Sequence, residues 1–174
     1  MDPFFDLQRN TVIDANWQVI KARIVAQDRD NDIAIIQADR NPFTNPPRAP
    51  IKMGDKEFGA THFASAKLNA NLPEQGTRVY VTGFPLGQAY MIVQEGTIAA
   101  VATELPGFGR GVKILVSTVA NHGNSGAPII NTSGEVIGVL EGEDRAPSQM
   151  QERTGISVAI PAFFVQKLAD TVIK

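Results

Sequence analysis

The chain has 174 residues, of which 43% are hydrophobic and 20% charged, enough to bury a core in one domain or in two small ones. A net charge of −2 gives no strong attraction to nucleic acid, and the absence of cysteine excludes disulfides and thiolate metal sites. No apolar run approaches the ~18 residues of a membrane helix, so membrane insertion is not expected.

Two strands are predicted in the first quarter of the chain, at residues 19–25 and 32–37, on either side of a charged turn. A proline-rich connector follows at residues 41–50, since proline cannot donate a hydrogen bond inside a sheet. Residues 54–76 have weak periodicity and indicate a long loop or insertion.

Short apolar segments separated by turn residues return from Thr77 onward. They predict strands at residues 78–83, 90–94, 96–101, 112–117, 128–132, 135–141 and 156–160. Pro161 precedes a stretch with helical spacing that extends to Ile173, which predicts a C-terminal helix. Many short strands at close spacing favour an antiparallel all-β barrel or sandwich.

A serine on a predicted tight turn is the strongest functional signal. Ser125 lies between Asn124 and Gly126, just before an apolar strand. Such a turn can present a hydroxyl beside exposed backbone N–H groups, as an acyl-transfer nucleophile requires. Taken alone, however, Gly-Asn-Ser-Gly is more often an ordinary hairpin turn.

Four segments follow one another along the chain: Asn31-Asp32-Ile33-Ala34-Ile35-Ile36, Gly76-Thr77-Arg78-Val79-Tyr80-Val81-Thr82-Gly83-Phe84-Pro85-Leu86-Gly87, Gly123-Asn124-Ser125-Gly126-Ala127-Pro128 and Gly155-Ile156-Ser157-Val158-Ala159-Ile160-Pro161. In this order they resemble trypsin-like serine proteases, most closely the HtrA or Do-like branch. The resemblance implies an all-β, trypsin-like double β-barrel with an incomplete first barrel and a short C-terminal helix. It assigns residues 1–45 to the first barrel, 46–76 to a crossover and long loop, 77–161 to the second barrel and 162–174 to the helix.

The resemblance also implies a role for each residue of the predicted active site. Ser125 would be the nucleophile and Asp32 would orient a base histidine. The backbone N–H groups of Gly123 and Ser125, with Asn124 between them, would form the oxyanion hole. The family usually has a second glycine where Ala127 stands, and Asn124 replaces the aspartate that pairs with a freed N-terminus in digestive relatives.

Substrate binding is expected on two further segments. Val119 and Ala120 would form an apolar wall of the primary pocket, which favours a small or medium apolar side chain over arginine or lysine. The strand that contains Val139, Leu140 and Glu141 would pair with the backbone of a peptide or unfolded protein substrate. The resemblance implies no metal and no cofactor.

The histidine that would act as the base is not found at its expected position in the sequence. Residues 1–31 contain no histidine, and the alignment puts that residue at or just before Met1, which predicts truncation of the first barrel. His62 and His122 are weak substitutes, and surface or packing roles suit both better. A turn with Asp28, Asp30 and Asp32 lacks the glycine and final glutamate of a calcium loop, so a solvated turn is favoured.

An incomplete first barrel would expose strand edges, so a homo-oligomer or a strand swap is expected. The N-terminus shows no signal-like stretch, and the family resemblance implies an extracytoplasmic location. Two functions stay open: a serine endopeptidase, inactive in this chain alone without its base, and a pseudo-protease that acts as a peptide-binding or assembly module.

Overall fold

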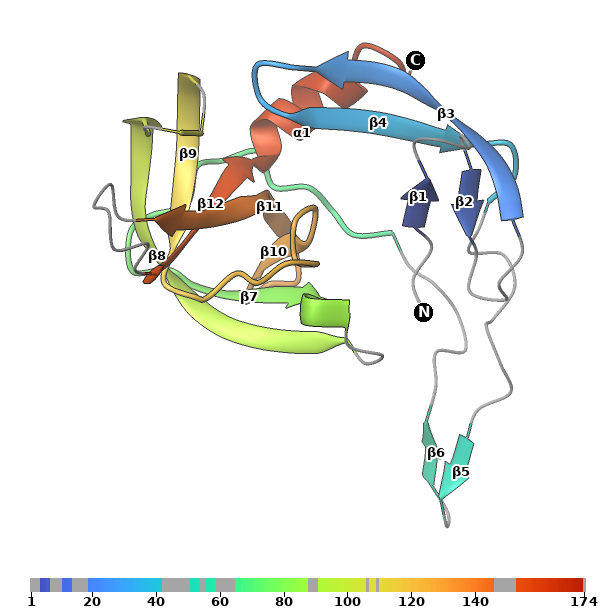
Figure 1. Ribbon diagram of the computed structural model, residues 1–174, viewed down its shortest axis with the longest axis horizontal. Coiled ribbons are helices and arrows are strands. Elements are labelled where there is room, and N and C mark those ends of the chain that lie inside the picture. The colour runs from blue at the N-terminus through green and yellow to red at the C-terminus, as the bar shows by residue number, and fades with distance from the viewer. Residues whose placement is uncertain are drawn as a thin grey trace. The chain divides into compact units, whose positions relative to one another are not determined.

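Two compact units make up the chain in the computed structural model (Figure 1). The first comprises residues 1–26 and 35–65, and the second comprises residues 27–34 and 66–174. The structure describes residues 4–6, 11–13, 19–41, 51–53, 56–58, 65–87, 91–105, 107–108, 110–145 and 153–173.

An antiparallel sheet and a small hairpin account for the strands that precede the barrel. The four-stranded sheet has the order β1 (Phe4–Asp6), β2 (Thr11–Ile13), β3 (Val19–Asp28) and β4 (Ile33–Ala38). The hairpin pairs β5 (Ile51–Met53) with β6 (Lys56–Phe58). β6 lies where the sequence predicts a loop, because a strand of three residues is too short to show an alternating pattern.

A closed antiparallel barrel dominates the second unit. Its strands are β7 (Arg78–Gly83), β8 (Ile92–Glu104), β9 (Arg110–Val116), β10 (Pro128–Asn131), β11 (Val136–Arg145) and β12 (Arg153–Pro161), paired in the order β10-β11-β12-β9-β8-β7. A short 3₁₀ turn, η1 (Pro85–Gly87), follows β7, and helix α1 (Ala162–Ala169) follows β12 directly. The predicted all-β fold with a closed second barrel and a short C-terminal helix is confirmed.

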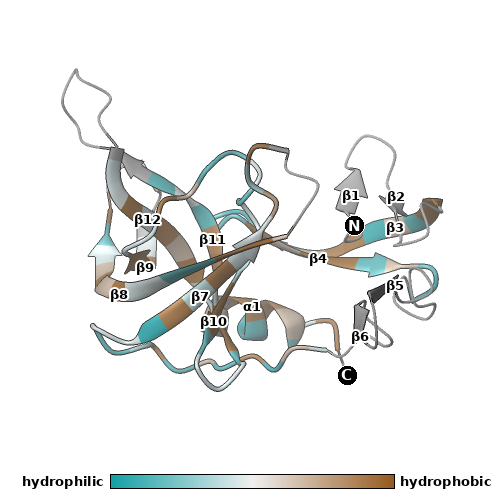
Figure 2. Cartoon of the chain, turned by 90° about the horizontal axis from the view of Figure 1, so that it is seen from below, coloured by the Kyte–Doolittle hydropathy of each residue, from teal (hydrophilic) through white to brown (hydrophobic). Residues whose placement is uncertain are grey.

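Alternating apolar side chains fill the barrel, and Figure 2 shows their hydrophobic residues along its strands. On β7, Val79 and Val81 are 0% and 1% exposed, whereas Arg78 at the start of the strand is exposed. Each such burial contributes roughly 1.5–3 kcal/mol to folding. The connected core comprises Val79, Val81, Ile98, Ile114, Val116, Ala120, Ala127, Ile129, Ile137, Leu140 and Ala159.

β8 continues through a position where the sequence predicts a break between two strands. Gly96 pairs with Val79 inside this strand, and a Cβ atom at residue 96 would lie 2.9 Å from the carbonyl oxygen of Ser117. The glycine therefore marks a close approach of two backbones and not a turn. Among the described residues, no helix has the length and apolar character needed to cross a membrane.

Candidate active site

The loop that carries Ser125 joins β9 to β10 and is fixed at both ends. Near its start, the fully buried Ser157 hydroxyl of β12 donates a 2.6 Å hydrogen bond to the carbonyl of Thr118. Near its end, the N–H of Leu140 on β11 donates to the carbonyl of Ala127 at 2.8 Å. Two barrel strands thus hold residues 118–127, which we call the nucleophile loop.

Two successive turns shape the middle of the nucleophile loop. The N–H of Asn124 donates to the carbonyl of Asn121 at 3.0 Å, and the N–H of Ala127 donates to the carbonyl of Asn124 at 2.9 Å. The Asn124 side chain is only 2% exposed, and its Nδ2 donates to Gln94 Oε1 at 3.4 Å. This buried amide anchors the loop from within and leaves Ser125 exposed at the tip.

Gly123 is required for steric reasons at this loop. Its φ of 96° lies in the left-handed region, and a Cβ atom there would lie 2.6 Å from the carbonyl oxygen of Phe84. The two segments are also joined by a hydrogen bond from the Leu86 N–H to the His122 carbonyl at 2.6 Å. The nucleophile loop is therefore seated directly on residues 84–86, which follow β7.

Two backbone N–H groups in the turn that carries Ser125 have no acceptor among the described residues. Within the described ranges, neither the Gly123 N–H nor the Ser125 N–H donates a hydrogen bond, whereas the Asn124 N–H is bonded to Asn121. Two unpaired N–H donors close in sequence to a nucleophile are the groups from which an oxyanion hole is built. Of the three residues predicted for this role, Gly123 and Ser125 have a free N–H group, whereas the N–H of Asn124 is bonded and its side chain is buried. The oxyanion-hole role stays a prediction.

The Ser125 hydroxyl donates a 3.0 Å hydrogen bond to the backbone carbonyl of Glu141. A carbonyl oxygen orients the hydroxyl but is not basic enough to remove its proton, so this contact does not activate the nucleophile. His122 is exposed, and the structure gives its side chain no hydrogen bond to Ser125. His62 lies outside the described residues.

The predicted substrate-binding residues surround the same loop. Val119 is 37% exposed and Ala120 is 5% exposed, so Val119 presents the larger apolar surface. On β11, Val139 has strands on both sides, opposite Pro128 of β10 and Ile160 of β12. The backbone N–H and carbonyl of Leu140 are both bonded to the nucleophile loop. Both backbone groups of Leu140 are therefore already paired in this structure, and the role of Val139, Leu140 and Glu141 in substrate binding stays a prediction.

Asp32 lies where β3 turns into β4, in the part of that hairpin that groups with the barrel. Its φ of 52° is a left-handed conformation that aspartate tolerates better than most residues. The carboxylate is exposed, and the structure shows no hydrogen bond between it and Ser125. The predicted triad role thus requires a histidine between the two residues, and that role stays a prediction.

Asp28, and not Asp32, organises this turn. Its carboxylate accepts hydrogen bonds from the side chain of Asn31 at 2.8 Å and from the N–H groups of Asp30 and Asn31 at 3.0 and 3.1 Å. The Asn31 side-chain bond is the main reason that the pKa of Asp28 is lowered. The carboxylate is committed to closing the turn, as expected of a solvated polar turn.

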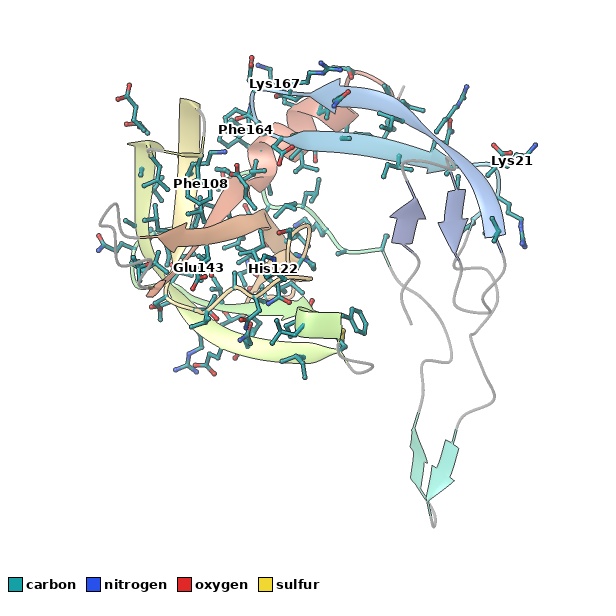
Figure 3. All side chains as sticks on the ribbon, in the orientation of Figure 1. Lys21, Phe108, His122, Glu143, Phe164 and Lys167 are labelled. Atoms are coloured by element: carbon teal, nitrogen blue, oxygen red, sulfur yellow. The ribbon has the colours of Figure 1, made fainter. Side chains whose placement is uncertain are left out.

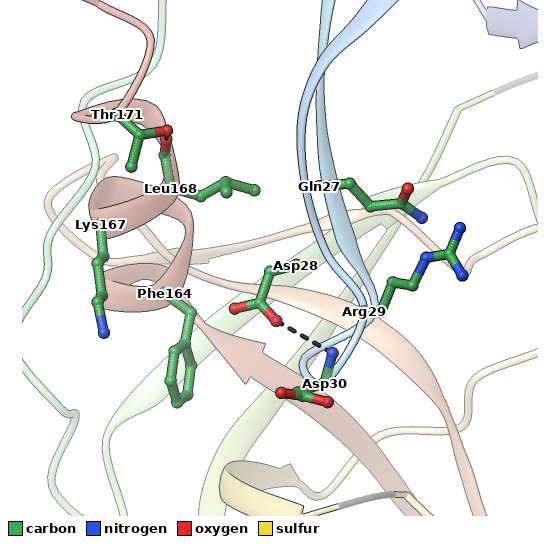
Figure 4. Close-up of a pocket in the computed structure, with 8 residues that line it drawn as sticks. All are labelled: Gln27, Asp28, Arg29, Asp30, Phe164, Lys167, Leu168 and Thr171. Carbon is green, nitrogen blue, oxygen red and sulfur yellow. Dashed lines mark hydrogen bonds between the residues drawn. The ribbon is translucent and has the colours of Figure 1, made fainter.

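A hollow of about 340 Å³ lies between this turn and helix α1 (Figure 4). None of its lining residues belongs to the nucleophile loop, and Figure 3 shows His122 well apart from Phe164 and Lys167 of α1. The hollow is therefore not part of the Ser125 site. Its lining residues are Gln27, Asp28, Arg29, Asp30, Phe164, Lys167, Leu168 and Thr171.

A buried ion pair adjoins the site and was not anticipated from the sequence. Lys113 on β9 is 1% exposed, and its Nζ lies 2.7 Å from Oε2 of Glu141, the residue whose carbonyl holds Ser125. The available signal was a lysine inside the apolar run Val112–Leu115, together with a glutamate in an apolar strand. Opposite charges inside two such strands indicate a paired, buried contact.

Comparisons with known proteins find relatives among serine proteases. Residues 5–139 match the model of the trypsin-like peptidase domain. A serine protease Do-like HtrA of Lactobacillus helveticus is 27% identical over 166 residues, covering 94% of this chain and 36% of the relative. A probable periplasmic serine endoprotease DegP-like of Marinomonas sp. (strain MWYL1) is 30% identical over 155 residues, covering 86% and 27%.

A solved structure of the HtrA-type protease AlgW with a decapeptide has the same fold, with a TM-score of 0.66 and 20% identity, covering 94% of this chain and 43% of that one. The chain spans about a third of the length of the curated relatives that it matches. The family model covers most of the chain, including the nucleophile loop. The chain therefore belongs to the trypsin-like peptidase domain family.

Proposed function

We propose that this chain is a serine endopeptidase domain that hydrolyses peptide bonds through an acyl-enzyme on Ser125. The observation that carries the proposal is an exposed serine in a turn where the N–H groups of Gly123 and Ser125 have no acceptor among the described residues. Each such donor stabilises a tetrahedral oxyanion by about 3–4 kcal/mol in related chemistry. The endopeptidase names of the relatives support the same reading.

In this mechanism, the Ser125 oxygen attacks the carbonyl carbon of the scissile peptide and its proton passes to a histidine base. The developing negative oxygen is bound by the Gly123 and Ser125 N–H groups, and Asp32 orients the histidine. The peptide C–N bond then breaks as the histidine gives its proton to the leaving amine, and water hydrolyses the acyl-enzyme and returns the proton to Ser125. Among the described residues, the Ser125 hydroxyl donates only to the Glu141 carbonyl, which is not a base, so this proposal takes the base histidine from outside the described residues. No step of this proposal uses a metal or a cofactor.

The substrate is a peptide or an unfolded protein segment. Its backbone would pair with the β11 edge from Glu141 onward, and its side chain would contact the apolar wall at Val119 and Ala120. The wall carries no charge, which favours a small or medium apolar residue before the cleaved bond. The decapeptide in the AlgW structure supports a peptide ligand. The periplasmic names of several relatives support an extracytoplasmic location, and the expected homo-oligomer remains part of the proposal.

A second function is favoured by one specific contact. The Ser125 hydroxyl is bonded to the Glu141 carbonyl, which cannot serve as a base. A chain that rests permanently in this arrangement would bind peptides without cleaving them, as a pseudo-protease does.

Labelling with a fluorophosphonate, followed by intact-mass analysis and peptide mapping, separates the two functions. A single adduct on Ser125 that is absent from Ser125→Ala establishes a working base and the peptidase. Absence of an adduct, together with saturable binding of a fluorescent apolar peptide, establishes the binding module. Failure of both measurements would refute the proposed site.

A further inference from the structure

The buried ion pair beside Ser125 has no assigned role in the chemistry. Lys113 lies in the middle of β9, opposite Ala102 of β8, and the next three residues of β9 pair with β12 on the other side. Its ammonium group is removed from water, so its free energy depends strongly on a charged partner. The Glu141 carboxylate at 2.7 Å is that partner.

The backbone at Glu141 needs such an anchor because it lies in a β-bulge. In the pairing of β11 with β12, Leu140 is opposite Ala159 and Gly142 is opposite Val158, which leaves Glu141 as the extra residue. A bulged residue is left unpaired in the strand ladder, and the bulge changes the direction of its side chain. The ion pair with Lys113 therefore fixes the Glu141 side chain at a point where the β11–β12 pairing does not hold the backbone.

The same residue contacts the nucleophile through its backbone. The Glu141 carbonyl accepts the Ser125 hydroxyl at 3.0 Å, and the preceding Leu140 carbonyl accepts the Gly126 N–H at 2.8 Å. A continuous path thus runs from a buried ammonium group, through one glutamate, to the serine oxygen.

We propose that Lys113 is a positioning residue for the nucleophile: its ion pair with Glu141 holds the bulged backbone whose carbonyl orients the Ser125 hydroxyl. The proposal rests on the proposed role of Ser125, but the orientation itself can be tested without catalysis. Lys113 does not touch the reacting atoms, and its effect passes through Glu141.

Amide hydrogen exchange measured by NMR on the full chain gives the test. Gly126 and Gly76 provide matched amides, since each donates a 2.8 Å hydrogen bond to a barrel carbonyl, of Leu140 and Ile98 respectively. In Lys113→Met, we expect the exchange rate of Gly126 to rise about tenfold relative to that of Gly76, because only the first bond adjoins the bulge, whereas a general loss of stability would accelerate both amides. Lys113→Arg, which retains the charge, should restore the Gly126 rate.

Arg78→Met is the control variant, because it removes a cation from the exposed Arg78–Glu95 pair of the same barrel and should leave both amides unchanged. Equal acceleration of Gly126 and Gly76 in Lys113→Met, or no change in either, would overturn the proposal. If Lys113→Met does not fold, Glu141→Gln tests the same link with the backbone carbonyl retained.

The labelling rate of Ser125 is the second readout. In a chain that labels, Lys113→Met should label several-fold more slowly and Lys113→Arg should recover. In a chain that does not label, the peptidase proposal fails, while the exchange ratio still decides whether Lys113 positions the loop.

Discussion

Substitution of Gly123 by alanine probes the seating of the nucleophile loop on the segment after β7. A left-handed φ such as the 96° of Gly123 costs a residue with a Cβ about 1–2 kcal/mol. The new methyl group would also lie 2.6 Å from the Phe84 carbonyl oxygen, a backbone atom that cannot rotate away. The segments would separate and lose the Leu86–His122 hydrogen bond, worth about 1 kcal/mol. We expect Gly123→Ala to lower the free energy of unfolding by about 2–3 kcal/mol.

Gly134→Ala isolates the conformational part of this cost. Gly134 lies in the turn between β10 and β11 with a φ of 78°, and a Cβ atom there would have no neighbour within 4 Å. Urea unfolding followed by circular dichroism should show a loss of only about 1–2 kcal/mol for this variant. If Gly123→Ala is no more destabilising than Gly134→Ala, the close contact with Phe84 does not constrain the loop and the reasoning is refuted.

Three further changes test other parts of the barrel. Lys113→Met leaves Glu141 as an unpaired, largely buried charge and should cost about 3–5 kcal/mol in urea unfolding, most of which Lys113→Met/Glu141→Met should recover; an additive double variant would contradict this. The pKa of Glu135 is lowered from 4.5 to about 2, chiefly by its hydrogen bond with Lys67. The ionised Glu135 carboxylate therefore stabilises the folded chain at pH values above the unfolded pKa, and this stabilisation is lost as the pH falls toward 2. The Tm difference between the wild type and Glu135→Gln should therefore shrink between pH 5 and pH 2, and a constant difference would exclude this pair as the cause. Gly96→Ala places a methyl group 2.9 Å from a carbonyl of the neighbouring loop and should lower the Tm, whereas an unchanged Tm would show that the backbones can separate freely.

Much of the barrel follows from local pattern. The alternation around Val79 and Val81 predicts β7 with the same bounds as the structure, because one face of this strand is fully buried. Gly96 misleads the prediction of β8, since glycine marks both turns and close backbone contacts, and only the position of Ser117 distinguishes the two. The strands of three residues before the barrel carry too few positions to show any period.

The site divides in a similar way. The tight turn that exposes Ser125 could be predicted from neighbouring residues, whereas its role as a nucleophile rests on the order of four segments and stays a prediction. The Lys113–Glu141 pair could not be placed, because its partners are 28 residues apart and meet only through the barrel register. The bulge at Glu141 depends on how β11 and β12 align, which no local pattern specifies.

The contact between Gly123 and Phe84 has a consequence for engineering this fold. The Phe84 carbonyl occupies the volume that a side chain at Gly123 would take, so the two segments fit together through their backbones and not through side chains. Grafting the nucleophile loop alone onto another barrel would transfer it without the backbone segment on which it rests. The unit that can be transplanted is discontinuous, and it must include residues 83–86 together with residues 121–127.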